Sequence, residues 1–433
     1  MYWEKEIETL PAPALRALQL QRLQTTLGRA LASPYYRRMY QDAGIAAEAV
    51  QTLADVRDLP FTTKHDLRAG YPDGFLTVAK EEIVRLHSSS GTTGQATVIF
   101  HTASDIADWA NLIARCMYMT GARKSDVFQN MTGYGMFTGG LGFHYGAEKL
   151  GTLTVPSGSG NSKRQVQFMK DFGTTIIHAI PSYALHLFSI FEELGVDPKR
   201  DLHLRIAYLG AEPYSEHTRQ RVETALGVKV YNSYGLSEMY GPGVAFECPE
   251  QEGMHLWEDC YLVEVINPTT LEPLPDGEEG ELVLTTLTRE AMPLIRYRTR
   301  DLTAILPGAC PCGRTHKRIA RIKGRTDDMF IVKGVNVFPM QVEKVLMGIP
   351  EVGVNYQIVL ETEEFIDTLT VKVEVRGEFF AGDVKGLKAL QQKIITDLKS
   401  ELLFTPKVLL VEPDSLPKSE GKAVRVFDNR QKE

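Results

Sequence analysis

The sequence predicts an α/β protein with a large N-terminal domain of mainly parallel sheets covered by helices, a small β-rich subdomain, and a small α+β C-terminal lid domain. Strand-like and helix-like segments alternate between residues 96 and 231, which indicates a parallel sheet with helices on its faces. The chain becomes β-rich after residue 255, and from residue 327 strands and two helices form a compact unit. A chain of 433 residues has room for roughly two to three domains.

The N-terminal part is expected to begin with helices and to continue with alternating strands and helices. Leucines recur at helical spacing between Leu15 and Leu27, so the first 60 residues are predicted to be helical. A strand over 83–87 and a β-rich run over 96–101 flank a loop of serines, threonines and glycines. The alternating region should contain helices over 102–120, 163–172, 183–194 and 216–226, and strands over 127–131, 152–155, 175–180, 204–209 and 229–231.

The C-terminal part is expected to hold a small barrel or sheet and then the lid. Three strands form the barrel or sheet, with a Pro-Asp-Gly turn at 275–277, and they cover 261–266, 280–287 and 302–306. The lid should contain a strand and hairpin after residue 327, helices near 341–347 and over 384–403, and strands over 355–360, 369–375 and 407–411. We therefore divide the chain into residues 1–326 and residues 327–433.

Composition and charge exclude several classes of protein. The chain has 48 basic and 55 acidic residues, a net charge of −7, which argues against nucleic acid as a partner. Five cysteines are too few for a disulfide scaffold and indicate a reducing, cytoplasmic setting. The acidic N-terminus lacks the order of a signal peptide. The uncharged stretch 127–147 holds six glycines, so it is predicted to be glycine-rich backbone passing close to something, with no membrane span.

Residues 88–97 form a loop of hydroxyls and glycines that suits phosphate binding. The run reads Ser-Ser-Ser-Gly-Thr-Thr-Gly-Gln-Ala-Thr, so backbone N–H groups can approach an anion while hydroxyls add donors. It differs from the usual nucleotide P-loop, which ends in Gly-Lys-Ser/Thr and leads into a helix. A flexible serine and glycine turn is the alternative.

Two acidic residues stand where a nucleotide and its metal ion could bind. Glu238 ends the run Tyr-Gly-Leu-Ser-Glu just after a predicted strand, and ligands of α/β sheets sit at the carboxyl ends of strands. A carboxylate there could hold Mg²⁺, whereas the alternative is a surface glutamate on a turn. Asp301 ends the basic run 296–300 and could accept hydrogen bonds from a ribose diol, whereas the alternative is an ordinary salt-bridged aspartate.

The cysteines suggest a structural zinc site. A tight Cys-Pro-Cys pair and an upstream Cys-x₆-His pair could together form a tetrahedral Cys₃His site from Cys248, His255, Cys310 and Cys312. Cys260 is a rival ligand, and Cys116 on an apolar helix face is expected to be a core residue. The alternative is three free thiols and a surface histidine. Four protein ligands would leave no open position for substrate, so such a zinc would be structural.

Six motifs follow one another in the order found in the adenylate-forming acyl-CoA synthetase superfamily. They are the loop 88–94, Gly-Ala-Glu-Pro at 210–213, Tyr-Gly-Leu-Ser-Glu at 234–238, residues 297–301, Gly-Arg-Thr-Asp-Asp-Met at 324–329, and Lys422. The stretches 133–140, 240–244 and 333–339 resemble phenylacetate–CoA ligases in particular. The resemblance runs from about residue 60 to residue 428. Most relatives have a lysine where this chain has Gln95, so a charged contact from that position is not carried over.

The resemblance implies two half-reactions. A carboxylate attacks the α-phosphorus of ATP to give an acyl adenylate and pyrophosphate, and coenzyme A then displaces AMP. By similarity, the triphosphate would be cradled by Ser89, Ser90, Gly91, Thr92, Thr93 and Gly94. Glu238 would hold Mg²⁺, Asp301 and Arg325 would take the ribose hydroxyls, and the rest of the nucleotide site would comprise Gly210, Ala211, Glu212, Pro213, Tyr234 and Gly235. Lys422 would bridge the carboxylate and the α-phosphate.

The resemblance also implies a mobile lid and an aromatic acid pocket. The lid would turn about a hinge at Asp327, presenting Lys422 for the first step and the loop at Lys333 and Gly334 for the second. Within the uncharged stretch, aromatic side chains beside small glycines suit a flat ring, and the candidate residues are Tyr134, Phe137, Gly139, Gly140 and Phe143. Aromatic core residues under a loop are the alternative.

The function that the sequence favours is a cytoplasmic, AMP-forming ligase that joins phenylacetate or a similar aryl acid to coenzyme A. An adenylating enzyme with another acceptor, such as a carrier protein or a deazaflavin cofactor, is the alternative among enzymes. A non-catalytic nucleotide-binding protein is the alternative from another class, and the joint presence of Glu238, Asp301, Arg325 and Lys422 argues against it. The oligomeric state stays open, with a homodimer among the alternatives.

Overall fold

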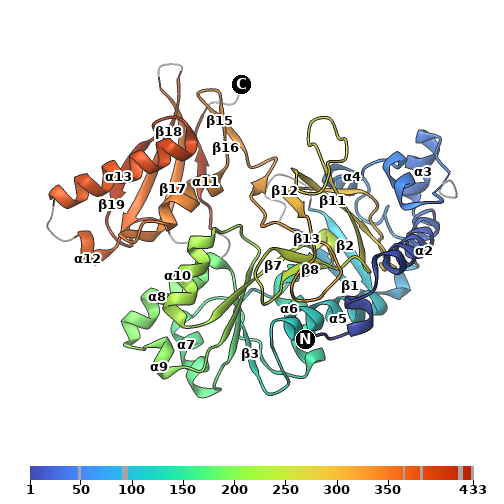
Figure 1. Cartoon of the computed structure of the whole chain (residues 1–433), viewed down its shortest axis with the longest axis horizontal. Coiled ribbons are helices and arrows are strands. Elements are labelled where there is room, and N and C mark those ends of the chain that lie inside the picture. The colour runs from blue at the N-terminus through green and yellow to red at the C-terminus, as the bar shows by residue number, and fades with distance from the viewer. Residues whose placement is uncertain (47–49, 90–95, 364–365, 381–383, 418–422, 431–433) are drawn as a thin grey trace.

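The structure is a computed structural model that describes residues 1–46, 50–89, 96–363, 366–380, 384–417 and 423–430. It has the predicted α/β architecture, with a large N-terminal body and a smaller C-terminal unit, the residues from 327 onward, drawn in orange and red in Figure 1. The predictions for seven residues concern positions outside the described ones: Ser90, Gly91, Thr92, Thr93, Gly94, Gln95 and Lys422.

Helices open the chain, as expected. They are α1 (Lys5–Glu8), α2 (Ala12–Ala30), α3 (Pro34–Ala43) and α4 (Lys64–Ala69), followed by the antiparallel hairpin of β1 (Ile83–Ser88) and β2 (Val98–Thr102). Helix α2 buries Leu15, Leu23 and Leu27 on one face, which confirms the predicted periodicity.

A parallel sheet forms the centre of the N-terminal body. Its strands are β3 (Val127–Asn130), β4 (Leu153–Val155), β5 (Ile176–Ala179), β6 (Ile206–Gly210) and β7 (Lys229–Leu236). The helices between and around them are α5 (Ala103–Met119), α6 (Thr138–Leu150), α7 (Ser162–Asp171), α8 (Pro181–Leu194), α9 (Pro198–Asp201) and α10 (Glu216–Leu226). Strands β5 and β6 are buried along their whole length, as expected for a sheet covered on both faces.

The uncharged stretch was predicted to be glycine-rich backbone passing close to something, and the structure adds that much of it is helix α6. The stretch becomes helical at Thr138, and its glycines let α6 lie against α5 at close range. A Cβ atom on Gly142 would lie 2.4 Å from the Trp109 ring, and one on Gly146 would lie 2.1 Å from Ile113. Packing between the two helices therefore outweighs the poor helix propensity of glycine.

The β-rich segment extends the same sheet in antiparallel fashion. Beyond β7 the order is β8 (Gly241–Glu247), β9 (Met254–Leu256), β13 (Arg318–Ile319), β12 (Tyr297–Leu306), β11 (Glu279–Thr286) and β10 (Tyr261–Ile266), and β14 (Gly324–Arg325) pairs with β12. Two strands are longer than predicted. Strand β7 continues to Leu236 and β12 begins at Tyr297, so both motifs lie largely on strands rather than after or before them.

The C-terminal unit has its own four-stranded sheet among the described residues, in the order β19-β18-β17-β20. Its elements are β15 (Phe330–Val332), β16 (Val335–Val337), α11 (Pro339–Met347), β17 (Val352–Glu363), β18 (Ile366–Val375), α12 (Gly377–Phe380), α13 (Val384–Leu402), β19 (Lys407–Val411) and β20 (Val426–Asp428). Helix α11 packs against α10, so the unit rests on the helical side of the parallel sheet (Figure 1).

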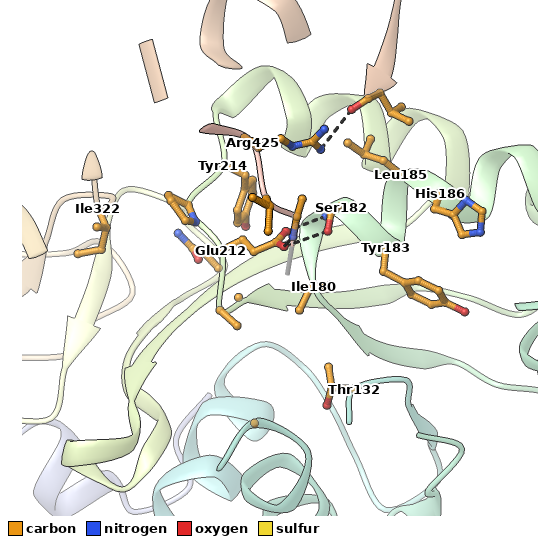
Figure 2. A pocket seen from close by; sticks show the side chains of 18 of the residues that line it. Thr132, Ile180, Ser182, Tyr183, Leu185, His186, Glu212, Tyr214, Ile322 and Arg425 are labelled. Atoms are coloured by element: carbon orange, nitrogen blue, oxygen red, sulfur yellow. Dashed lines mark hydrogen bonds between the residues drawn. The ribbon is translucent and has the colours of Figure 1, made fainter. Parts of the chain in front are cut away.

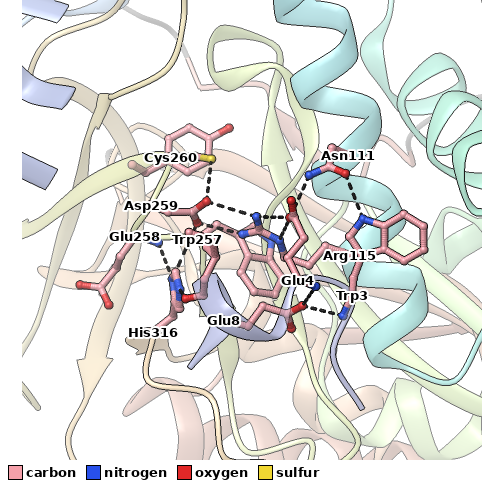
Figure 3. A network of polar contacts seen from close by, with 12 residues as sticks. Trp3, Glu4, Glu8, Asn111, Arg115, Trp257, Glu258, Asp259, Cys260 and His316 are labelled. Atoms are coloured by element: carbon pink, nitrogen blue, oxygen red, sulfur yellow. Dashed lines mark hydrogen bonds and ion pairs between the residues drawn. The ribbon is translucent and has the colours of Figure 1, made fainter. Parts of the chain in front are cut away.

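The N-terminal segment is fastened by a buried polar network (Figure 3). The Arg115 guanidinium of α5 donates to Asp259 at 2.8 Å and to Glu4 at 2.6 Å. Nearby, Arg314 donates to the fully buried Glu8 carboxylate at 2.7 Å. Glu4 thus ties the first residues of the chain to α5, and Glu8 ties them to the loop between β12 and β13. Within the described residues, none of the helices combines the length and apolar character that a membrane crossing needs.

Candidate active site

A cavity of about 2360 Å³ lies between the N-terminal body and the C-terminal unit, at the carboxyl ends of the parallel strands. It is lined by every described residue predicted for the nucleotide and the acid except Lys333 and Gly334: Ser89, Tyr134, Phe137, Gly139, Gly140, Phe143, Gly210, Ala211, Glu212, Pro213, Tyr234, Gly235, Glu238, Asp301, Arg325 and Asp327. Lys333 and Gly334 instead form the turn between β15 and β16. Motifs spread over more than 230 positions of the sequence therefore surround one space.

Asp301 lies on β12, at the point where this strand pairs with β14. The register of this pair places it opposite Arg325, whose Nη1 is 3.7 Å from the carboxylate, and the Tyr234 hydroxyl donates to the carboxylate at 2.5 Å. Burial raises the pKa of Asp301 to about 6, and the nearby charge of Glu238 adds to this, while Tyr234 and Arg325 oppose it. A buried acceptor with this pKa is sensitive to modest acidification.

Arg325 links Asp301 to the predicted hinge residue. Its Nε and Nη2 atoms donate to the two carboxylate oxygens of Asp327 at 2.8 and 2.9 Å. Burial would raise the pKa of Asp327, but the hydrogen bond from Arg325 and its charge outweigh burial and lower it. The first residue of the C-terminal unit is thus paired with a residue that lines the cavity.

Glu238 lies in a short turn of 3₁₀ helix, Ser237–Met239, directly after β7. The residue is only 6% exposed and yet lines the cavity. The alternative of a surface glutamate is therefore wrong. A buried carboxylate facing a cavity matches the oxygen ligands that Mg²⁺ prefers.

Glu212 joins the body of the protein to the C-terminal unit (Figure 2). Its carboxylate accepts hydrogen bonds from the N–H and hydroxyl groups of Ser182, at 3.1 and 3.0 Å, and from the N–H of Ala423 at 2.7 Å. Ala423 is the residue after Lys422 in the sequence. Ser182 was not predicted, because a serine after a strand carries no local mark of such a role.

The predicted acid pocket is built from β3, β5 and the start of α6. Phe143 is fully buried and stacks on His178 of β5 with ring centroids 3.8 Å apart, so it is a core residue that also lines the cavity. Tyr134 accepts a hydrogen bond from Asn130 Nδ2 at 3.0 Å. Phe137 differs from both, because 52% of it is exposed. His178 and Asn130 were missed, since each looked like an ordinary member of a buried strand.

Four residues form a compact group that could hold a metal ion: Cys248, His255, Cys310 and Cys312. Their ligand atoms all lie within 4.8 Å of one another, with 3.6 Å between the Cys248 and Cys310 sulfurs and 3.2 Å between Cys312 Sγ and His255 Nε2. For Zn–S bonds of about 2.3 Å, tetrahedral sulfur ligands lie about 3.8 Å apart. The group thus has nearly the spacing that zinc requires.

The surroundings of this group also suit a metal. His255 Nδ1 lies 3.1 Å from the backbone oxygen of His316, so the hydrogen is on Nδ1 and the lone pair of Nε2 faces the sulfurs. Cys260 lies outside the group, and its thiol donates weakly to Asp259, so it is not a rival ligand. Cys116 is a buried core residue, as predicted.

Family models match the two parts of the chain. The model described as AMP-binding enzyme matches residues 35–287, and the model described as AMP-binding enzyme C-terminal domain matches residues 334–430. The chain therefore belongs to the AMP-binding enzymes. Among curated relatives, the phenylacetate-coenzyme A ligase of Thermus thermophilus is 47% identical over 99% of this chain and 100% of its own length. That of Escherichia coli is 44% identical over 98% and 97%. Within the family, the chain belongs with the phenylacetate-coenzyme A ligases.

Two solved structures of one ligase indicate how the N-terminal body and the C-terminal unit of this chain are arranged. A 2-hydroxyisobutyryl-CoA ligase in the postadenylation state, in complex with 2-HIB-AMP, has a TM-score of 0.94 at 30% identity and covers 99% of this chain and 92% of that chain. The same ligase in the thioesterification state, with 2-HIB-AMP and CoA, has a TM-score of 0.74 at 31% identity and covers 99% and 93%. Because both are states of one ligase, the difference reflects domain arrangement. The arrangement here matches the postadenylation state.

Proposed function

We propose that this protein joins phenylacetate, or a closely similar aryl acid, to coenzyme A and converts ATP to AMP and pyrophosphate. The main support for this proposal is a single cavity. Asp301, Arg325 and Glu238 line it together with the aromatic and glycine residues around Phe143. The phenylacetate-coenzyme A ligases at 44–47% identity support the choice of acid.

In the first half-reaction, a carboxylate oxygen of the acid attacks the α-phosphorus of ATP and the bond to pyrophosphate breaks. Two anions must approach each other, so the site must neutralise charge and hold them in line. We assign this work to Lys422, between the carboxylate and the α-phosphate, and to the loop 89–94 around the triphosphate. Glu238 would hold Mg²⁺, Asp301 and Arg325 the ribose, and residues 210–213 the adenine, with Tyr234 and Gly235 beside them.

In the second half-reaction, the thiolate of coenzyme A attacks the acyl carbon and AMP leaves. We propose that residues 327–433 form a mobile domain that turns about Asp327 against residues 1–326, exchanging Lys422 for the turn at Lys333 and Gly334. Two observations support this division. The family models match separate stretches of the chain, and the two states of the 2-hydroxyisobutyryl-CoA ligase differ in their likeness to this chain.

We propose that the Cys₃His group holds a structural Zn²⁺. Three sulfur atoms and one imidazole nitrogen suit zinc, and the hydrogen bond from His255 Nδ1 to His316 sets the required tautomer. None of the four residues lines the large cavity, which fits a structural role. None of the five cysteines, all of them among the described residues, forms a disulfide, which favours a cytoplasmic location. A homodimer stays open.

The test is product analysis with the purified protein, ATP, Mg²⁺ and phenylacetate, with and without coenzyme A. We expect the rate of pyrophosphate release to increase when coenzyme A is added. AMP and phenylacetyl-CoA should then form in equal amounts. Pyrophosphate release that coenzyme A leaves unchanged would favour a different acceptor, namely a carrier protein or a deazaflavin cofactor. No release with any aryl acid would favour a non-catalytic nucleotide-binding protein.

A further inference from the structure

His178 holds a polar atom at the wall of the acid pocket. The residue belongs to β5, is 4% exposed and lines the cavity beside Phe143, on which its ring stacks. Its Nδ1 atom lies 3.0 Å from the Oδ1 atom of Asn130. Among the described residues, Nε2 has no hydrogen-bond partner. The atom is also not fully buried. Nε2 is therefore open to the cavity.

The hydrogen bonds of Asn130 decide which nitrogen of His178 carries the hydrogen. The Nδ2 group of Asn130 donates to the Tyr134 hydroxyl at 3.0 Å and to the Gly140 carbonyl at 2.7 Å, so both of its hydrogens are used. Its Oδ1 atom, which also accepts from the Thr132 hydroxyl at 2.8 Å, must then accept from His178 Nδ1. The imidazole is the Nδ1–H tautomer, and Nε2 offers a lone pair to the pocket.

The ring also stays neutral. Burial lowers the pKa of His178 to about 3, so protonation does not remove this lone pair near neutral pH. Phe143, Gly140 and Tyr134 line the same cavity. An unsubstituted aromatic ring would leave the Nε2 acceptor without a partner, and a ring with a hydroxyl or amino group would supply the missing donor.

We infer that His178 is a specificity-determining residue, whose Nε2 atom selects aryl acids that carry a hydrogen-bond donor on the ring. This inference rests on the proposed function, because it assumes an aryl acid in the pocket. A ring hydroxyl donates its hydrogen to Nε2, while the tautomer set by Asn130 excludes Nε2 as a donor. The acids that fit best are therefore hydroxyphenylacetates or aminophenylacetates rather than phenylacetate itself.

The test compares the 2-, 3- and 4-hydroxyphenylacetates with the corresponding fluorophenylacetates, which are close in size but cannot donate. Thioester formation gives kcat/KM for each acid. In the unmodified protein, the ratio for hydroxyl over fluorine should be about three- to tenfold for at least one ring position, the gain expected from one neutral hydrogen bond. Ratios near one at all three positions would overturn the inference without any variant being made. Absence of thioester with every aryl acid would instead overturn the proposed function.

Two variants identify the acceptor. His178→Leu should bring the favourable ratio down to about one, whereas Ser159→Ala, which removes a hydroxyl lining the same cavity, should keep it. His178→Gln, which retains a polar side chain with an acceptor oxygen, should keep part of the preference if the leucine variant folds poorly. A ratio that survives His178→Leu in a folded protein, or that is lost in Ser159→Ala with His178 intact, would contradict the assignment to His178.

Discussion

The Glu343 carboxylate of the C-terminal unit accepts a hydrogen bond from the Ser215 N–H, at 3.1 Å, at the start of α10 in the N-terminal body. The same carboxylate accepts from the Thr218 hydroxyl in the first turn of α10. Burial raises the pKa of Glu343, although these hydrogen bonds oppose the shift. The C-terminal unit thus binds the first turn of a helix that is capped by its own residue Ser215, in the arrangement that matches the postadenylation state.

Removing this contact should shift the balance between the two half-reactions. We expect Glu343→Ala to slow acyl-adenylate formation about three- to tenfold, because the variant loses hydrogen bonds that hold the C-terminal unit against α10 in the present arrangement. Thioester formation from supplied phenylacetyl adenylate should not slow. Single-turnover kinetics of each step measure this.

The matched control is Glu401→Ala. Glu401 pairs with the exposed Lys344 within the C-terminal unit, so its loss should leave both steps unchanged. Equal slowing of both steps in Glu343→Ala would mean that Glu343 supports the fold rather than the arrangement of the domains.

Nucleotide binding should weaken on acidification because of Asp301. Its pKa is raised to about 6 by burial, so below this pH the carboxylate is protonated and no longer a charged acceptor for the ribose. Affinity for 5′-sulfamoyladenosine, which carries no titrating phosphate, should rise with pH through about 6 and then level off. Calorimetry at several pH values measures it. Asp301→Asn should bind weakly at every pH, and a wild-type affinity independent of pH would contradict the assignment.

Lys422 should be needed for one half-reaction only. Lys422→Ala removes the charge assigned to the reacting phosphate, so adenylate formation should fall by at least about a hundredfold. Starting from synthetic phenylacetyl adenylate, the same variant should make thioester at close to the wild-type rate. Rapid-quench measurements of the two steps decide this. Equal loss of both would show that the lysine holds the nucleotide or the fold.

The zinc proposal predicts about one zinc ion per chain by elemental analysis. Cys310→Ser with Cys312→Ser should lose the metal and lower the melting temperature, because the binding energy of a structural metal is folding energy. The N-terminal segment should then be cleaved more readily by protease, since the Tyr2 hydroxyl donates to the Cys312 carbonyl at 2.9 Å. Cys260→Ser, outside the group, should keep its zinc. A stable, metal-free wild-type preparation would refute the proposal.

Elements whose local preferences agree with their packing were predictable. Helix α5 is one, because the Thr102 side chain caps it, Asp105 completes the capping box, and its apolar face is continuous. Helix α6 was missed, because its glycines disfavour a helix and their contacts with Trp109 and Ile113 cannot be read from the sequence.

Two strands, β7 and β12, were predicted too short because their additional residues include polar ones. Strand β12 begins five residues earlier than predicted because its arginines have buried partners, among them Glu281, which binds Arg298 at 2.7 Å. Each motif can be recognised in the sequence alone, so the residues that surround the cavity could be predicted. The link between Glu343 and Ser215 joins positions 128 residues apart, and neither residue carries a local mark of it.

In the proposed mechanism, an acyl adenylate links the two half-reactions. Phenylacetate labelled with ¹⁸O in both carboxylate oxygens tests it most directly, by mass spectrometry of the products. If a carboxylate oxygen attacks the α-phosphorus and the C–O bond breaks when coenzyme A attacks, AMP must carry one labelled oxygen and the thioester must keep the other. Unlabelled AMP formed together with phenylacetyl-CoA would show that the thioester forms without an acyl adenylate.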